Sequence, residues 1–92
     1  MPDDVIRKRC VVHGKVQGVF FRDSTHEEAE RQGVRGWVRN RSDGAVEAVL
    51  EGAHEAVDAV IRFFNEGPDR AQVQEVEVHE EEPEGLSSFE VR

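Results

Sequence analysis

The sequence predicts an α+β fold in which an antiparallel sheet carries two helices on one face, with the element order βαββαβ of the ferredoxin-like type. Two segments of alternating polarity, residues 34–40 and 45–51, flank an Asp-Gly turn, which is the pattern of a β-hairpin. Residues 53–64 carry apolar side chains at the spacing of one helix face. An apolar segment at residues 5–13 runs through a glycine-containing loop into a polar helical segment. The order of these segments, closed by a further strand, predicts the fold.

The first strand is expected over residues 5–13, with its buried centre at Val11 and Val12. Cys10 lies in the same apolar run and is the single cysteine of the chain. One cysteine excludes a disulfide within the chain and a cysteine-based metal site. Its place in a strand favours a small core residue over a nucleophile.

The first helix is expected from near Asp23 to about Gln32, with Gly33 as its C-terminal stop. Asp23-Ser24-Thr25 offers side chains that accept hydrogen bonds from the first turn of a helix. The apolar stripe of this helix is narrow and repeats every four residues: Phe21, Thr25 and Ala29. We therefore expect contacts of the preceding phenylalanines to hold the helix more than its own apolar face does.

Each strand of the hairpin has one face that we expect to be buried. The first strand presents Val34, Gly36 and Val38 on that face and Arg35, Trp37 and Arg39 on the other. The return strand presents Val46, Ala48 and Leu50 inward. Glu47 and Glu51 alternate with these residues and are expected to face outward.

The second helix has the clearest pattern in the sequence. Its apolar positions fall on one face: Ala53, Ala56, Val57, Val60, Ile61 and Phe64. Gly67-Pro68 is expected to end it. A strand follows within residues 71–79, where a β-bulge or a late start would explain the break in alternation between Val73 and Val76. After an acidic loop, residues 89–92 are expected to form a short last strand.

Length and charge limit the classes of function. Ninety-two residues suit one domain, residues 1–92, which is large enough for a single core. The net charge of −8 argues against a general nucleic-acid binder, since a phosphate backbone requires a basic surface. The charge is uneven, because residues 1–22 carry a balance of +3 and residues 66–92 a balance of −7. No apolar run approaches a membrane span, and the acidic start at residues 1–4 is unlike a signal peptide, so we expect a cytoplasmic monomer without membrane partners.

The loop from Gly14 to Arg22, with the sequence Gly-Lys-Val-Gln-Gly-Val-Phe-Phe-Arg, predicts an anion site. A strand that turns through glycines into a helix leaves backbone N–H groups unpaired, and the positive end of the helix dipole adds to their attraction for anions. Gly14 and Gly18 have access to backbone angles closed to other residues and allow a ligand to approach the main chain. Arg22 adds a planar charged group that matches two oxygens of a phosphate. By itself the pattern indicates phosphate or carboxylate binding, with a glycine turn beside a surface arginine as the alternative.

The same loop, followed by Gly36-Trp37-Val38-Arg39-Asn40 and then Asp43-Gly44, resembles the acylphosphatase family over nearly the whole chain. The resemblance implies hydrolysis of a small acyl phosphate to a carboxylate and inorganic phosphate, without metal or cofactor. It places the phosphate-binding arginine at Arg22 and the water-positioning asparagine at Asn40. It makes backbone N–H groups of the loop the rest of the phosphate site: Lys15, Val16, Gln17, Gly18, Val19, Phe20, Phe21 and Arg22. Inorganic phosphate and sulfate are then expected to compete with the substrate.

The chemistry of these residue types agrees with the resemblance. Phosphoryl transfer needs charge stabilisation on the phosphoryl oxygens and an in-line nucleophile. Arg22 and oriented amides supply the first. The Asn40 carboxamide has an acceptor and a donor, so it can orient a water molecule but cannot take its proton. The resemblance implies that the substrate's own phosphate accepts that proton.

Several residues have simpler interpretations. Without the resemblance, Asn40 would be read as serving only the turn that follows it. His13 adjoins the loop, but a histidine at a strand end with no visible carboxylate partner is more often structural than a base. Trp37 is expected to pack rather than to bind substrate, and Arg39 and Arg41 to face solvent. The remaining histidines are scattered along the chain, so no metal site is expected: His26, His54 and His79.

Other functions fit parts of the pattern. A non-catalytic module that binds phosphorylated ligands would have the same motifs, but the intact pair of Arg22 and Asn40 argues against lost turnover. An RNA-binding sheet of this topology needs exposed aromatic side chains and basic strands, which the net charge of −8 opposes. A role in handling carbamoyl phosphate within a larger maturation protein is disfavoured for a free-standing domain.

Overall fold

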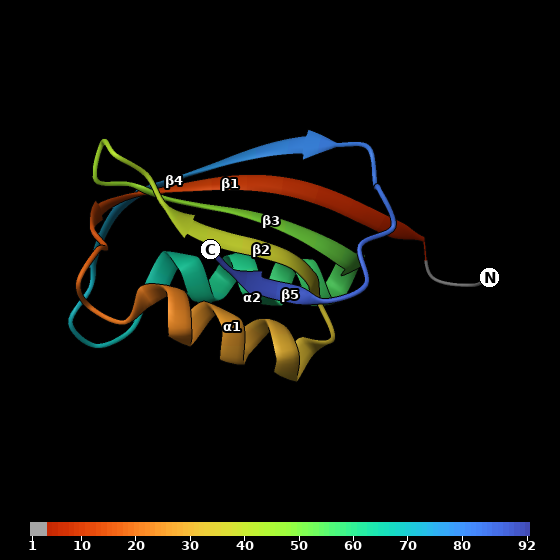
Figure 1. The fold of residues 1–92 in the computed structure, drawn as a ribbon, viewed down its shortest axis with the longest axis horizontal. Helices are drawn as coiled ribbons and strands as arrows, with labels where there is room; N and C mark the ends of the chain where they lie inside the picture. The colour runs from red at the N-terminus through yellow and green to blue at the C-terminus, as the bar shows by residue number, and fades with distance from the viewer. Residues whose placement is uncertain (1–3) are drawn as a thin grey trace.

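The structure, a computed structural model, describes residues 4–92. The comparison of residues 1–4 with a signal peptide rests mostly on residues 1–3, which lie outside the described part. The strands and helices follow one another along the chain (Figure 1) as β1 (Val5–Lys15), α1 (Phe21–Gln32), β2 (Arg35–Asn40), β3 (Val46–Ala53), α2 (His54–Glu66), β4 (Gln72–Glu81) and β5 (Phe89–Val91). Both helices lie on the same side of the sheet, so the predicted arrangement is confirmed.

The sheet has the strand order β4-β1-β3-β2-β5. Strands β1 to β4 pair antiparallel, as predicted for the βαββαβ order. β5 instead runs parallel to β2, with Gly36 opposite Phe89, so the sheet is mixed rather than wholly antiparallel. The reason is that the chain crosses from one edge of the sheet to the other between β4 and β5. The crossing also brings Arg92 beside β2, where its N–H donates to the carbonyl oxygen of Val38.

β1 runs two residues beyond its predicted end, through an irregularity in its pairing with β4. His13 lies opposite Glu75 but the next residue, Gly14, lies opposite Val73, so β4 has one extra residue here. The predicted bulge is therefore confirmed. Gly14 has a φ of 130°, and a Cβ added there would lie 2.1 Å from the carbonyl oxygen of Gln72. Gly14 therefore allows β1 and β4 to approach each other. The sequence had instead suggested that it allows a ligand to approach the main chain.

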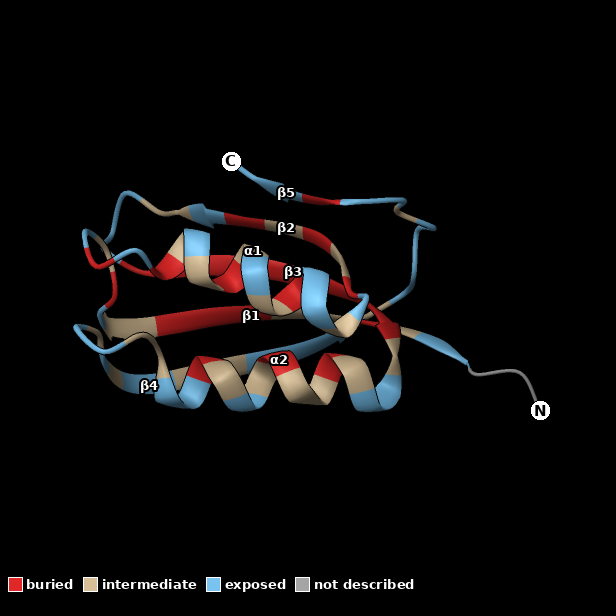
Figure 2. Ribbon diagram, turned by 90° about the horizontal axis from the view of Figure 1, so that it is seen from below, coloured by how far each residue is buried: buried red, intermediate tan, exposed pale blue. Residues whose placement is uncertain are grey.

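The core lies between the sheet and the helices, and each helix buries one stripe of residues (Figure 2). α1 buries the predicted set, Phe21, Thr25 and Ala29. α2 buries Val57, Val60 and Phe64, while Ala56 and Ile61 are partly buried against the same core. The rings of Phe21 and Phe64 stack with their centroids 5.8 Å apart, which joins the two helices. Cys10 is fully buried, as predicted for a core residue.

α1 begins at Phe21, two residues before its predicted start. Its N-cap is Phe20, which has a φ of 63° and makes no side-chain capping bond. The prediction that Asp23-Ser24-Thr25 starts the helix is wrong, because Thr25 is buried on the core face and its Oγ1 has no hydrogen-bond partner among the described residues. Burial of Phe21 against α2 favours the helical conformation earlier in the chain, since tertiary packing outweighs local capping.

Phe64→Ala is expected to lower the free energy of unfolding by about 3 kcal/mol, because the Phe64 ring is fully buried and its removal leaves a cavity. Chemical denaturation measures the change. Asn65→Ala, at the exposed neighbouring position of α2, is the matched control and should change stability by less than about 1 kcal/mol. An unchanged denaturation midpoint for Phe64→Ala would contradict the packing of α2 on the sheet.

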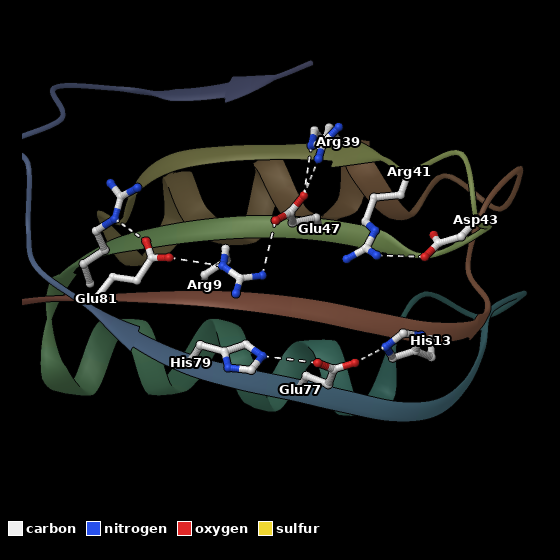
Figure 3. Close-up of polar contacts among 10 residues, drawn as sticks. Arg9, His13, Arg39, Arg41, Asp43, Glu47, Glu77, His79 and Glu81 are labelled. Carbon is white, nitrogen blue, oxygen red and sulfur yellow. Dashed lines mark hydrogen bonds and ion pairs between the residues drawn. The ribbon is translucent and has the colours of Figure 1, made fainter.

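The face of the sheet away from the helices carries a network of ion pairs (Figure 3). Glu47 accepts hydrogen bonds from Arg39 at 2.6 Å and from Arg9 at 3.4 Å. Arg9 also donates to Glu81, whose other oxygen accepts a hydrogen bond from Arg7. The network pairs arginines of the basic N-terminal segment with a glutamate of the acidic C-terminal segment. The uneven charge of the sequence is thus partly compensated by the pairing of β1 with β4.

Glu47 and Glu51 lie on this outer face as predicted, yet both are buried there, Glu51 completely. Glu51 accepts a hydrogen bond from Arg7 at 2.8 Å and others from the backbone N–H groups of residues 84–86. Burial raises the pKa of the Glu51 carboxyl, but these donors outweigh burial and lower the pKa to about 2. A buried carboxylate therefore holds the loop that carries the chain from β4 to β5.

Acid is expected to weaken the fold through Glu51. The pKa of Glu51 in the folded state, about 2, lies below its ordinary value of 4.5. The stabilisation of the folded state by the ionised carboxylate is therefore complete above about pH 4.5 and is lost as the pH falls toward 2. We expect this contribution to fall by roughly 3 kcal/mol between about pH 5 and pH 2. Urea denaturation should show that Glu51→Gln is less stable than wild type at about pH 5 and that the difference in free energy of unfolding narrows at about pH 2. A difference of equal size at the two pH values would contradict the lowered pKa. Glu27→Gln, on the exposed side of α1, is the matched control.

Candidate active site

The loop between β1 and α1 has a path set by buried side chains and by backbone conformation. Val16 and Val19 are buried in the core. Gly18 has a φ of 75° and Phe20 a φ of 63°, both in the left-handed region. Phe20 is 71% exposed, so its own burial does not account for this conformation. A non-glycine residue stays in this region where the surrounding structure imposes it, which indicates a well-defined loop.

A pocket of about 300 Å³ opens where this loop meets α1 and the end of β2. It is lined by Val16, Gly18, Phe20, Phe21, Arg22, Asp23 and Asn40. Arg22 belongs to α1 and Asn40 to β2, and both elements reach the end of the sheet where β1 stops (Figure 1). The first turn of α1 contributes N–H groups without a partner inside the helix, and the positive end of the helix dipole. The predicted anion-binding loop and the predicted catalytic pair therefore meet at one cavity.

Arg22 is half-buried in the first turn of α1. Its Nη1 donates a hydrogen bond of 2.9 Å to the main-chain oxygen of Arg92, just beyond β5. Nε and Nη2 of Arg22 have no hydrogen-bond partner within residues 4–92. Arg92 therefore orients the guanidinium and leaves donors available to an anion in the pocket.

Asn40 is the last residue of β2 and pairs with Val46 in the β2–β3 ladder. Its carboxamide makes no hydrogen bond to any other described residue. Other groups close the turn that follows, because Asp43 accepts hydrogen bonds from the Ala45 N–H and from the Arg41 guanidinium. The turn thus does not use the Asn40 side chain, which leaves the carboxamide available to a water molecule.

Three of the predicted phosphate-binding residues lie outside the lining of the pocket. Lys15 ends β1 and is exposed, and Val19 is buried in the core. The Gln17 side chain reaches the β2–β3 turn, where Nε2 donates to the carbonyl oxygens of Arg41 and Ala45. Lys15, Gln17 and Val19 are not among the residues that line the cavity. A role for their backbone N–H groups in anion binding stays a prediction.

Three basic or aromatic side chains in and after β2 contact other side chains of the protein. Arg39 is exposed, as expected, whereas Arg41 is half-buried, and each forms an ion pair with a carboxylate. Two guanidinium groups lie over the Trp37 ring, that of Arg39 at 5.9 Å from the ring centroid and that of Arg92 at 5.0 Å. The expected packing role of Trp37 is confirmed, with cation–π contacts on the outer face of the sheet.

The sequence analysis did not predict several features near the site. One is that Asp23 lines the pocket, which its position directly after Arg22 could have suggested. His13 has a carboxylate partner, Glu77 of β4, at 2.5 Å on the outer face of the sheet (Figure 3). This hydrogen bond lowers the pKa of Glu77. The contacts of His13 and of Arg92 join residues far apart in the sequence, so no local pattern marks them.

His26 lies in α1 and His54 in α2, each beside a carboxylate of its own helix. His79 is not isolated as expected, because it and His13 both contact Glu77. Within residues 4–92, no group of three His, Cys, Asp or Glu side chains is placed to hold a metal ion. Neither α1 nor α2, the helices in the described part of the chain, has the length and apolar character that crossing a membrane requires.

Comparison with known proteins gives matches across nearly the whole chain. A family model described as Acylphosphatase matches residues 8–91. The acylphosphatase of Rubrobacter xylanophilus is 60% identical over 87 residues, covering 94% of this chain and 79% of its own length. That of Haloarcula marismortui is 54% identical over 86 residues, covering 94% of each chain. The structure of an acylphosphatase from Coxiella burnetii has a TM-score of 0.93 and 39% identity, over 97% of this chain and 94% of that one. The chain therefore belongs to the acylphosphatase family, whose members are hydrolases of acyl phosphates.

Proposed function

We propose that residues 1–92 form one acylphosphatase domain in which Arg22 and loop N–H groups bind the phosphate of an acyl phosphate and Asn40 orients the attacking water. The observation that carries the proposal is the shared pocket, which Arg22 of α1 and Asn40 of β2 line together with the loop. The Asn40 carboxamide supports it further, because it can bind water without giving up a contact to any described residue. Family membership supplies the class of reaction.

The phosphate binds, in this proposal, at the first turn of α1. Fixed N–H donors need little reorganisation when charge develops on the phosphoryl oxygens, so they stabilise the transition state better than bulk water does. Arg22 adds a guanidinium whose direction is set by the main-chain oxygen of Arg92. The N–H donors are drawn from Lys15, Val16, Gln17, Gly18, Val19, Phe20, Phe21 and Arg22.

The water held by Asn40 attacks phosphorus in line with the acyl oxygen. A new P–O bond forms as the bond between phosphorus and the carboxyl oxygen breaks, and the carboxylate leaves with the electron pair. The water's proton passes to an oxygen of the phosphate, since a carboxamide has no usable proton affinity. Asp23 is the carboxylate that lines the pocket and is the alternative proton acceptor. Loss of turnover in Asp23→Asn would assign the proton to Asp23 instead.

The volume of the pocket suits a small molecule. We propose that the monomer is the active unit and that no cofactor, nucleic acid or membrane takes part. Burial raises the pKa of the Cys10 thiol to about 12, so this group stays protonated and takes no part in the reaction. A free buried thiol is compatible with the reducing cytoplasm, where we place the protein. Inorganic phosphate and sulfate share the charge and shape of the phosphate group and are the proposed competing ligands.

The test of the proposed function is release of inorganic phosphate from acetyl phosphate, measured with and without EDTA. We expect release well above the spontaneous rate and equal in both conditions, because neither Arg22 nor Asn40 acts through a metal. The variant that combines Arg22→Ala with Asn40→Ala is the control for a contaminating activity. Tight binding of phosphate without release of product would favour the non-catalytic anion-binding module. Release that disappears with EDTA would contradict a reaction carried by these residues alone.

A further inference from the structure

We infer that the side chain of Gln17 is a positioning residue, which sets the distance between the phosphate-binding loop and Asn40. The inference rests on the proposed function, because it concerns the alignment of the bound phosphate with the water that Asn40 orients. The role belongs to the side-chain carboxamide and is separate from anion binding by the backbone N–H of the same residue.

The Gln17 carboxamide joins two segments that are far apart in the sequence. Its Nε2 donates to the carbonyl oxygen of Arg41 at 2.7 Å and to that of Ala45 at 2.9 Å. Two carbonyl acceptors require the nitrogen and not the oxygen of the carboxamide, so the orientation of the group follows from its partners. Both N–H bonds of the amide point into the β2–β3 turn, which lies at the same end of the sheet as the loop (Figure 1).

The turn that receives these hydrogen bonds is itself well defined. The Arg41 N–H donates to the Ala45 oxygen at 2.8 Å, and the Gly44 N–H donates to the Arg41 oxygen at 3.2 Å. Asp43 adds hydrogen bonds to Arg41 and Ala45. Arg41 directly follows Asn40. The hydrogen bond from Gln17 to the Arg41 carbonyl oxygen therefore ties the phosphate-binding loop to the main chain next to the proposed water-binding side chain.

Other contacts fix the loop to the core, and this separates positioning from folding. Val16 and Val19 are buried on either side of Gln17 and Gly18. Loss of the Gln17 carboxamide should therefore leave the loop folded and its N–H groups able to bind phosphate. What it should change is the placement of that phosphate relative to Asn40, and misplacement by about 1 Å can cost up to about 10²-fold in rate.

The experiment compares Gln17→Met, which keeps the length of the side chain without its donors, and Gln17→Ala with wild type. We expect kcat for acetyl phosphate to fall about tenfold in both variants, while the dissociation constant of inorganic phosphate changes less than about twofold. Gln32→Ala is the matched control, because that carboxamide binds Glu28 within α1, away from the pocket. Unchanged kcat in both Gln17 variants, or phosphate affinity that falls in step with kcat, would overturn the inference.

A double-mutant cycle with Asn40→Ala then tests whether Gln17 acts through Asn40. If it does, Gln17→Met should lower kcat about tenfold in the wild-type background but less than about twofold in the Asn40→Ala background. Equal losses in both backgrounds would overturn the positioning role and leave the proposed function standing. Wild-type turnover in Asn40→Ala alone would instead overturn the proposed function, and the inference with it. The two failures are therefore distinguishable.

Discussion

Arg22→Ala is expected to lower kcat/KM for an acyl phosphate by about 10³-fold or more, the range found for arginines that stabilise a transferring phosphoryl group. The guanidinium would contact the phosphate in the ground state and in the transition state, so substrate binding and turnover should fall together. The variant should also lose the rise in melting temperature that phosphate or sulfate gives the wild type by mass action. Steady-state kinetics and thermal denaturation with and without phosphate measure the two effects.

Two variants control for changes other than loss of the Arg22 guanidinium. Arg31→Ala removes an exposed arginine at the other end of α1 and should leave activity and protection unchanged. Arg22→Lys keeps the charge but not the planar fork, so it should recover only part of both effects. If phosphate protects wild type and Arg22→Ala equally, the anion binds elsewhere in the molecule.

Asn40→Ala is expected to lower kcat by about 10²- to 10³-fold, the scale of one preorganised polar group at a reaction centre. The carboxamide would act on the water, whose position matters mainly on the way to the transition state, so kcat should fall without a matching loss of phosphate affinity. The melting temperature should stay close to wild type, because the Asn40 side chain has no hydrogen bond to any residue within 4–92. Single-turnover kinetics measure the chemical step directly.

Asn65→Ala is the matched control for this variant, since it removes an exposed carboxamide from α2. His13→Ala serves a second purpose. His13 lies on the outer face of the sheet with Glu77 and does not line the pocket, so its removal should leave turnover largely in place. Loss of turnover in His13→Ala would assign the histidine a role that the geometry does not provide.

Local periodicity was sufficient to predict most of the fold. The alternation on both sides of Asp43-Gly44 predicts β2 and β3, and the apolar stripe that ends at Phe64 predicts α2. The break in alternation after Val73 left a bulge and a late start of the strand open, and the pairing shows the bulge. These features follow from the spacing of neighbouring residues, which the sequence displays directly.

The parts that local patterns did not predict depend on contacts between distant segments. Glu51 has the sequence position of an outward-facing residue, yet Arg7 and the N–H groups of residues 84–86 make it a buried carboxylate. α1 starts at Phe21 because that ring packs on α2, which outweighs the capping residues that follow. The parallel pairing of β5 likewise depends on where the preceding loop crosses the sheet.

The candidate site also combines features that local sequence patterns predict with features that depend on contacts between distant segments. The anion-binding role predicted for Arg22 and the loop amides follows from the chemistry of a glycine-containing loop that enters a helix, whereas the role predicted for Asn40 required the family resemblance. The side chain of Gln17 and the main-chain oxygen of Arg92 had no local signal, because each acts on a partner across the fold. Contacts between residues far apart in the sequence are therefore the part of the site that is visible in the structure but not in local sequence patterns.

The proposed division of labour between Arg22 and Asn40 is tested most directly by measuring phosphate affinity and the single-turnover rate in the same Asn40→Ala protein. Calorimetric titration with inorganic phosphate gives the affinity, and rapid quench with acetyl phosphate gives the rate. We expect the dissociation constant to stay within about twofold of wild type while the rate falls by about 10²-fold or more. A wild-type rate in Asn40→Ala, or an affinity that falls as far as the rate does, would contradict the assignment of Asn40 to the water.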